Sequence, residues 1–184
     1  NKILEELIRH FIEVHGFTRL NFLAGPEDHL DSQKRLESYK RVLAEFGIPV
    51  EEDRIFHGDF WKHMGVDAVE YWLSSSLEKP QAIICANDYM AITVVEELGR
   101  RGIAVPGEMA VSGCDNAVDS SEYVHGITTV NTPFEEMGRE AVNKIDRINK
   151  GQLEENISYV DTKTIYRKSC GCTKSEKEIS DSKQ

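Results

Sequence analysis

Positive charge is scarce in this chain. Of its 184 residues, 32 are aspartate or glutamate and only 22 are lysine or arginine, which gives a formal net charge of −10. A nucleic-acid-binding surface needs clustered basic side chains to neutralise phosphates. The composition therefore argues against nucleic-acid binding by this polypeptide itself. No apolar run approaches the roughly 18 residues of a membrane-spanning helix, so we expect no membrane partner.

Sequence patterns that mark catalytic sites or metal sites are also lacking. There is no Gly-x-Ser-x-Gly motif, no phosphate-binding loop and no dinucleotide-binding glycine pattern. No pair of histidines has the His-x-x-x-His or His-Glu-x-x-His spacing; the six are His10, His15, His29, His57, His63 and His125. We therefore expect no catalytic residue, no metal site and no cofactor, and an enzyme built on this chain is the weaker hypothesis.

The four cysteines do not form a disulfide framework. Cys85 and Cys114 lie in apolar stretches, where a free thiol behaves as a small hydrophobic side chain. Cys170 and Cys172 form a single Cys-x-Cys pair, which cannot fill a tetrahedral zinc site alone. A local disulfide, or further ligands donated by another chain, are alternatives for this pair. Reduced cysteines favour a cytoplasmic location.

The stretch from Pro80 to Asn116 has the pattern of a strand, a helix and a second strand. The apolar run at 82–86 is typical of a strand buried on both faces. Asp88 can cap the helix that follows, whose apolar residues recur at helical spacing until Gly102 ends it. The second strand, at 109–114, is followed by Asp115. Because ligands bind at the carboxyl ends of parallel strands, we expect a site at this edge.

The residues before Pro80 repeat the alternation. We expect helices at 1–15, 31–46 and 62–77, with Asp31 or Ser32 as the cap of the second, and strands at 18–24 and 54–57. Strands that alternate with helices predict an α/β fold, in which a parallel sheet lies between two layers of helices as three α/β/α layers.

The pattern changes after Asn116. A polar, irregular stretch at 117–126 precedes a short predicted strand at 127–130. Thr132-Pro133-Phe134-Glu135 has the form of a capping box and predicts a helix that runs to about Asn149. A last strand is predicted within 157–167, and the charged residues 173–184 are typical of a tail or linker.

Two segments carry a family resemblance: AIICANDYMA at 82–91 and GIAVPGEMAVSGCDN at 102–116. They resemble the effector-binding domain of the LacI/GalR (lac repressor/gal repressor) family of transcriptional regulators. The resemblance implies the periplasmic-binding-protein-like type I fold, in which a ligand binds between two lobes. This chain would supply the second lobe (1–116), a crossover and helix returning to the first lobe (117–151), a final strand (152–172) and a polar tail or linker (173–184). Asn1 is not a natural initiator, so we expect a fragment that lacks most of the first lobe and any DNA-binding headpiece.

Four residues at the predicted strand ends form the candidate ligand site, and the resemblance agrees with each: Arg35, Phe60, Asn87 and Asp115. A guanidinium offers forked donors to hydroxyls or a carboxylate, and an aromatic ring stacks on a sugar or a purine. A carboxamide both donates and accepts, and a carboxylate accepts from paired hydroxyls. Such a set suits a polyhydroxylated ligand better than a lipid or a metal.

Each of these residues also has an ordinary structural alternative. Arg35 could be a surface arginine, and Phe60 could pack between lobes while Trp61 provides the aromatic platform. Asn87 could cap a helix, and Asp115 could be a turn residue.

The resemblance implies a ligand sensor that works as a cytoplasmic homodimer, binds a sugar-like effector and reaches DNA only through a domain absent from this chain. One alternative is a sensor fused to a C-terminal output module, such as a diguanylate cyclase or an AraC-type domain, because the ending Ser169-Cys-Gly-Cys172 resembles such sensors. Another is an extracytoplasmic sugar-binding transport receptor.

Overall fold

A parallel four-stranded sheet forms the centre of the molecule. The computed structural model describes residues 2–117, 126–152 and 157–172. The strands β1 (Leu20–Ala24), β2 (Ile55–His57), β3 (Ala82–Cys85) and β4 (Ala110–Ser112) lie in the order β2-β1-β3-β4. Every residue of β1, β3 and β4 is buried, as expected for strands covered on both faces. Each strand is shorter than predicted: β1 and β2 begin later, β3 ends one residue earlier, and β4 is shorter at both ends.

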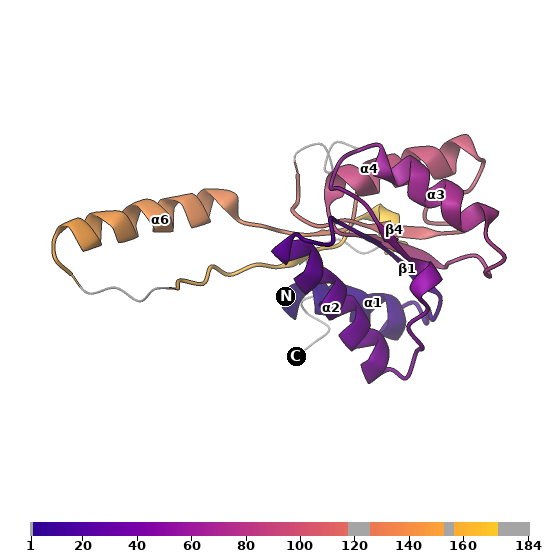
Figure 1. Ribbon diagram of the computed structural model, residues 1–184, viewed down its shortest axis with the longest axis horizontal. Coiled ribbons are helices and arrows are strands. Elements are labelled where there is room, and N and C mark those ends of the chain that lie inside the picture. The colour runs from indigo at the N-terminus through magenta and orange to yellow at the C-terminus, as the bar shows by residue number, and fades with distance from the viewer. Residues whose placement is uncertain (1, 118–125, 153–156, 173–184) are drawn as a thin grey trace.

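Two helices cover each face of the sheet (Figure 1). The helices α1 (Lys2–Glu13) and α2 (Leu30–Glu45) lie on one face, and α3 (Met64–Ser74) and α4 (Asp88–Arg100) lie on the other. Their apolar stripes pack on the strands in one continuous core, whose largest fully buried side chains include Phe11, Phe22 and Tyr39. The predicted three-layer α/β/α architecture is therefore confirmed. In the described part of the chain, no helix combines the length and apolar character needed to cross a bilayer.

The caps of two helices differ from the predictions. The cap of α4 is Asn87, whose Oδ1 accepts from the backbone N–H of Met90 at 2.9 Å; it is not Asp88, which lies inside the helix. The cap of α2 is His29 rather than Asp31 or Ser32, with Nδ1 accepting from the N–H of Asp31 at 3.2 Å. In both helices, the cap is thus a residue one or two positions before the predicted one.

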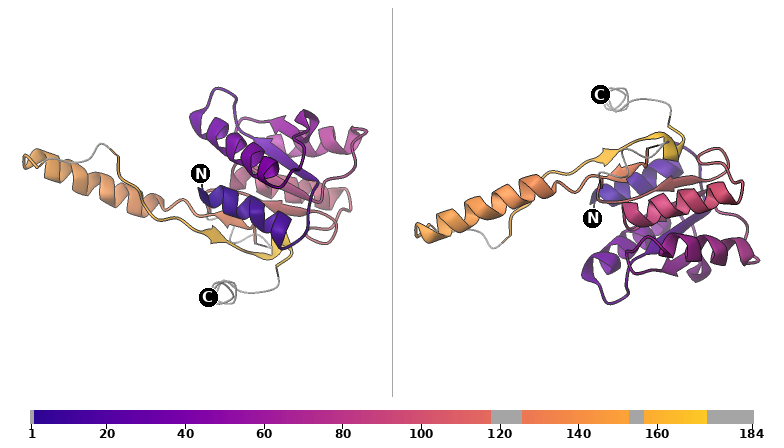
Figure 2. Two further views of the ribbon diagram at one scale, coloured as in Figure 1. Left: turned by 90° about the horizontal axis from the view of Figure 1, so that it is seen from below. Right: turned by 90° about the horizontal axis from the view of Figure 1, so that it is seen from above.

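The described residues between 131 and 163 form an arm that leaves the body. The strands β5 (Thr129–Val130) and β6 (Thr164–Ile165) pair antiparallel, and α6 (Phe134–Asn149) lies between them in sequence. Figures 1 and 2 show α6 projecting away from the sheet on these two connections. None of its residues is buried. The last strand covers far less than the predicted 157–167, and the predicted tail at 173–184 lies outside the described residues.

The predicted capping box at the start of α6 is absent. The helix begins after Pro133 with no side-chain hydrogen bond to its cap. The hydroxyl of Thr132 instead donates to Asp115 Oδ1 at 3.2 Å. Thr132 therefore bonds to the sheet edge and not to its own helix.

Candidate functional site

The four predicted site residues lie along one edge of the sheet. Phe60 follows β2, Asn87 follows β3, Asp115 follows β4, and Arg35 lies in α2, the helix that follows β1. The carboxyl ends of all four strands meet here, because the strands run parallel. They form a row in which hydrogen bonds join two pairs, Arg35 with Asp115 and Asn87 with Phe60.

Arg35 and Asp115 form the charged pair of this row. Arg35 Nη2 lies 2.9 Å from Asp115 Oδ1, and Nη1 donates to the carbonyl oxygen of Ala86 at the end of β3. Burial opposes the charge of the guanidinium, yet the neighbouring Cys114 and Asp115 raise the pKa of Arg35 overall, so it stays protonated. Within the described part of the chain, the two hydrogen bonds that the Asp115 carboxylate accepts both go to Oδ1, so a ligand hydroxyl can donate to Oδ2.

Asn87 and Phe60 form the other half of the row. Asn87 Nδ2 donates to the carbonyl oxygen of Phe60 at 2.8 Å, while Oδ1 caps α4. The amide therefore holds the aromatic loop and begins a helix at the same time. The Phe60 ring packs edge-on against His29, with centroids 5.1 Å apart. Trp61, the alternative platform, is 68% exposed and has no such support from a neighbouring ring in the described chain.

Backbone strain is concentrated at this edge. Among the described residues, three that are not glycine have positive φ angles: Phe60 (71°), Asp115 (108°) and Asn116 (56°). Such conformations cost about 1–3 kcal/mol each and persist where the surroundings enforce them. Two of the three are predicted ligand residues, so the strain marks the same edge that the sequence indicated.

Several residues of the edge were not predicted as part of the site. Asp88 is buried, and its carboxylate accepts from the N–H of Ala117 at 2.7 Å and from the hydroxyl of Thr129 at 2.6 Å. Asn116 bonds to Asn131 (3.0 Å) and to Arg167 (2.7 Å). These contacts join β4 to the segments on either side of the arm. Nothing in the local sequence pattern indicates them, because the partners are 15 to 51 residues apart.

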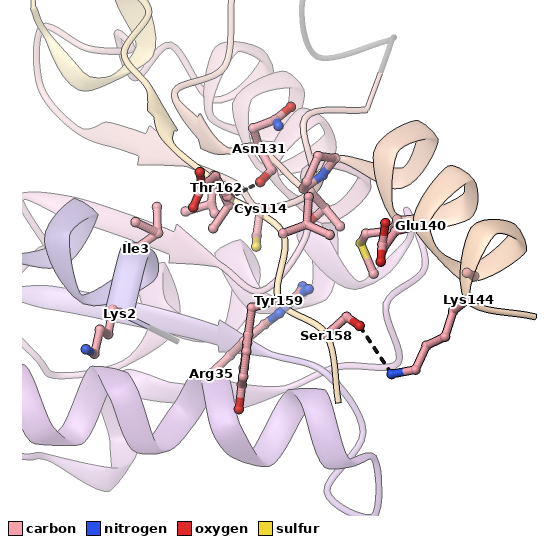
Figure 3. Close-up of a pocket in the computed structure, with 17 residues that line it drawn as sticks. Lys2, Ile3, Arg35, Cys114, Asn131, Glu140, Lys144, Ser158, Tyr159 and Thr162 are labelled. Carbon is pink, nitrogen blue, oxygen red and sulfur yellow. Dashed lines mark hydrogen bonds between the residues drawn. The ribbon is translucent and has the colours of Figure 1, made fainter. Parts of the chain in front are cut away.

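A hollow of about 700 Å³ lies between the body and the arm (Figure 3). Arg35 and Cys114 line its body side, and Glu140, Lys144 and Tyr159 line its arm side. Phe60, Asn87 and Asp115 do not line it. The hollow therefore overlaps the predicted site only at Arg35, and the rest of the row faces the open edge of the sheet.

One further group of side chains has the chemistry of metal ligands. His10, His15, Cys170 and Cys172 place their ligand atoms within 4.8 Å of one another. They lie away from the row, since His15 and the neighbouring Pro106 precede β1 and β4 at the amino ends of the strands. Spacing along the chain could not predict this cluster, because the histidines and the cysteines come from opposite ends of the sequence.

The sheet order, the layers and the polar carboxyl edge define an α/β domain of the periplasmic-binding-protein type. The profile of the periplasmic binding protein-like domain matches residues 8–170. The chain belongs to this family and, within it, to the effector-binding domains of the LacI/GalR type.

Characterised relatives are transcriptional repressors. The chain is 31% identical over 156 residues to catabolite control protein A of Priestia megaterium, covering 84% of this chain and 47% of the relative. It is 31% identical over 151 residues to the ribose operon repressor of Escherichia coli, with coverages of 82% and 46%. The chain thus spans about half the length of the curated relatives it matches. These relatives are not enzymes, in agreement with the absence of a predicted catalytic group.

Solved structures give the same result. The Escherichia coli repressor ascG superposes with a TM-score of 0.84 at 29% identity, covering 91% of this chain and 60% of ascG. The regulator CelR in complex with cellobiose superposes with a TM-score of 0.82 at 30% identity, with coverages of 91% and 51%.

Proposed function

We propose that this chain supplies one lobe of the effector-binding domain of a LacI-type transcriptional regulator. A small polar metabolite of the sugar class binds at the carboxyl edge of the sheet, against a second lobe contributed by the rest of the protein. Arg35, Phe60, Asn87 and Asp115 make the contacts from this lobe. The regulator works as a cytoplasmic homodimer and reaches DNA through a separate domain.

The row of Phe60, Asn87, Arg35 and Asp115 along one edge of the sheet is the observation that carries this proposal. It combines an aromatic ring with a paired guanidinium and carboxylate on a strained, preorganised edge. Hydroxyl groups of a sugar can accept from the guanidinium and donate to Asp115 Oδ2, while the ring covers an apolar sugar face. The similarity to a ribose operon repressor and to a cellobiose-bound regulator supports a carbohydrate as the ligand.

The exposed face of α6 supports a two-lobed arrangement. Phe134, Met137, Ile145 and Ile148 lie on one face of α6 and are between 46% and 64% exposed. An amphipathic helix with an uncovered apolar face needs a partner surface. A first lobe that packs on this face would also close over the row. Ligand binding then stabilises the closed form by making contacts with both lobes at once.

The test is a thermal-shift screen of the complete protein against pentoses, hexoses, disaccharides, nucleosides and amino acids. A ligand that binds the native state raises the melting temperature. We expect a hit among the carbohydrates. No hit from carbohydrates, together with a hit from the amino acids, would contradict the proposed ligand class.

Asp115→Asn tests the site within the same screen. Asparagine keeps the shape and tolerates a positive φ, but it loses the charged acceptor. We expect the affinity for the hit to fall about 10- to 100-fold, since a hydrogen bond to a charged group contributes about 1.5–3 kcal/mol. Asp53→Ala is the matched control, because Asp53 is exposed and precedes β2 at the opposite end of the strand. Equal affinities in Asp115→Asn and the wild type would remove Asp115 from the site.

A further inference from the structure

Four side chains from the two ends of the described chain meet beside α1. His10 lies in the last turn of α1, His15 follows that helix, Cys170 ends the short helix at Lys168–Cys170, and Cys172 lies two residues further. Their ligand atoms all lie within 4.8 Å of one another. His15 and Cys172 are 157 residues apart in sequence, so only the fold brings these groups together.

The distances within the cluster are those of a small coordination shell. His10 Nε2 lies 3.1 Å from His15 Nε2. Cys172 Sγ lies 3.2 Å from His10 Nε2 and 3.6 Å from His15 Nε2. A tetrahedral zinc ion with Zn–N of about 2.0–2.1 Å and Zn–S of about 2.3 Å separates its ligand atoms by roughly 3.3–3.8 Å. The separations among His10, His15 and Cys172 lie within a few tenths of an ångström of these values, whereas the upper bound of 4.8 Å for the whole group means that Cys170 would move by up to about 1 Å to bind the ion.

The surroundings hold the four groups in place. The His10 ring lies against Tyr166, with centroids 4.3 Å apart, and the His15 ring stacks on Phe17 at 5.2 Å. Gly171 has a φ of 91°, a left-handed conformation that favours glycine and lets the chain reverse between the two cysteines. His10 and Cys170 are buried, and His15 and Cys172 are partly buried. The ligand atoms are thus largely shielded from competing water.

We propose that His10, His15, Cys170 and Cys172 form a structural zinc site. Two thiolates and two imidazoles make a complete tetrahedral set for this ion, with no position left for a reacting water, so the site is structural and not catalytic. Both thiols lose their protons to solvent as the two Zn–S bonds form, and the resulting site is electrically neutral. The site fastens the last described turn of the chain to its first helix.

The environment of the single residues agrees with this assignment. The described cysteines are all free thiols, and the other two, Cys85 and Cys114, are buried elsewhere in the core. The cluster shares no residue with the proposed ligand row, so the two proposals stand independently.

A cobalt titration of the complete protein, purified without a polyhistidine tag and stripped with a chelator, tests the site. One equivalent of Co²⁺ should give thiolate-to-metal absorption in the near ultraviolet and the intense red-visible bands of a tetrahedral ion. One equivalent of Zn²⁺ should abolish both and raise the melting temperature. We expect Cys172→Ser to lower the affinity at least about 100-fold, because a thiolate ligand is lost.

Two control variants separate this site from adventitious binding. Cys114→Ser changes a buried thiol outside the cluster, and His63→Asn changes an exposed histidine on another face. Both should bind Co²⁺ like the wild type. Absence of the thiolate band in the wild type, a band that persists in Cys172→Ser, or a Cys170–Cys172 disulfide in the protein as purified would each overturn the proposal. The Co²⁺ titration of the wild type tests the proposed site even if Cys172→Ser does not fold.

Discussion

At the scale of single residues, Asp88 organises the edge on which the proposed ligand site is built. Its carboxylate is buried and accepts from Ala117 and Thr129, two residues on either side of the stretch 118–125. Its own N–H donates to the carbonyl oxygen of Cys114 at 2.9 Å. The side chain also fits closely beside Gly113, where an added Cβ would lie 2.1 Å from Asp88 Oδ1. Asp88 thus fixes the chain immediately before and after Asp115.

Asp88→Ala should therefore lower the free energy of unfolding by about 3 kcal/mol, because a buried N–H and a hydroxyl lose a charged acceptor. Urea denaturation followed by circular dichroism measures this change. Asp53→Ala is the control and should stay within about 0.5 kcal/mol of the wild type, since its side chain is exposed. A similar small change in both variants would show that the Asp88 contacts contribute little.

The role of a side chain was predictable where its partners are close in sequence, and less so where its partners are far along the chain. The polar residues after β3 and β4 were identified from their positions at strand ends, and the structure brings Asn87 and Asp115 to one edge. The sequence could not tell which of Asn87 and Asp88 caps α4 and which bonds to distant residues, because both residue types can cap a helix. Only the positions of Ala117 and Thr129 in space decide between them.

At the scale of elements, the loops after β1 and β2 fit together at one contact. Gly25 follows β1 and lies under the ring of Phe60, so that an added Cβ would be 2.2 Å from Phe60 Cζ. Asn87 holds Phe60 from the other side through its carbonyl oxygen. The ring is therefore confined between two elements, which preorganises the aromatic surface.

Gly25→Ala should displace the Phe60 ring and lower the free energy of unfolding by about 1–3 kcal/mol through overpacking. Gly99→Ala is the matched control, because a Cβ at that helical position meets nothing within 4 Å. It should raise the stability by about 0.5–1 kcal/mol. Thermal denaturation of both variants checks the difference. Combining Gly25→Ala with Phe60→Leu should recover part of the loss, and no recovery would contradict the contact.

The order of helices and strands in the body was predictable from hydrophobic periodicity and glycine stops, whereas the connections of the arm were not. Thr132 shows the reason: its sequence context fits a capping box, but the hydroxyl finds Asp115 on β4's carboxyl side. The contact between His10 and Cys172 was unpredictable for the same reason, because no local sequence pattern connects the two residues. Local propensity predicts elements, and long-range contacts decide which alternative partner a polar side chain takes.

At the scale of the whole molecule, α6 is the feature that the described body does not explain. A sixteen-residue helix with one apolar face extends from the body without a buried residue (Figure 2). The complete protein must cover this face if the proposed two-lobed arrangement is correct.

Ile145→Glu combined with Ile148→Glu should lower the stability of the complete protein by at least about 2 kcal/mol, because two charges would be forced into an apolar contact. Asn143→Glu is the matched control on the opposite side of the helix and should have little effect. Chemical denaturation of the three proteins measures the outcome. If the double variant is as stable as the control, α6 faces solvent in the complete protein and the proposed lobe contact is wrong.

Asp115 is also bonded to the base of the arm. Its N–H donates to Val130, its carbonyl oxygen accepts from the N–H of Thr132, and its carboxylate accepts from the hydroxyl of Thr132. A rotation of the arm about these hydrogen bonds would make it a lever that pivots beside Asp115. A helix of sixteen residues is about 24 Å long, so a rotation of about 10° at the fulcrum would swing its far end by about 4 Å. A change in the Asp115 contacts smaller than a hydrogen-bond length would therefore be magnified at the tip of α6.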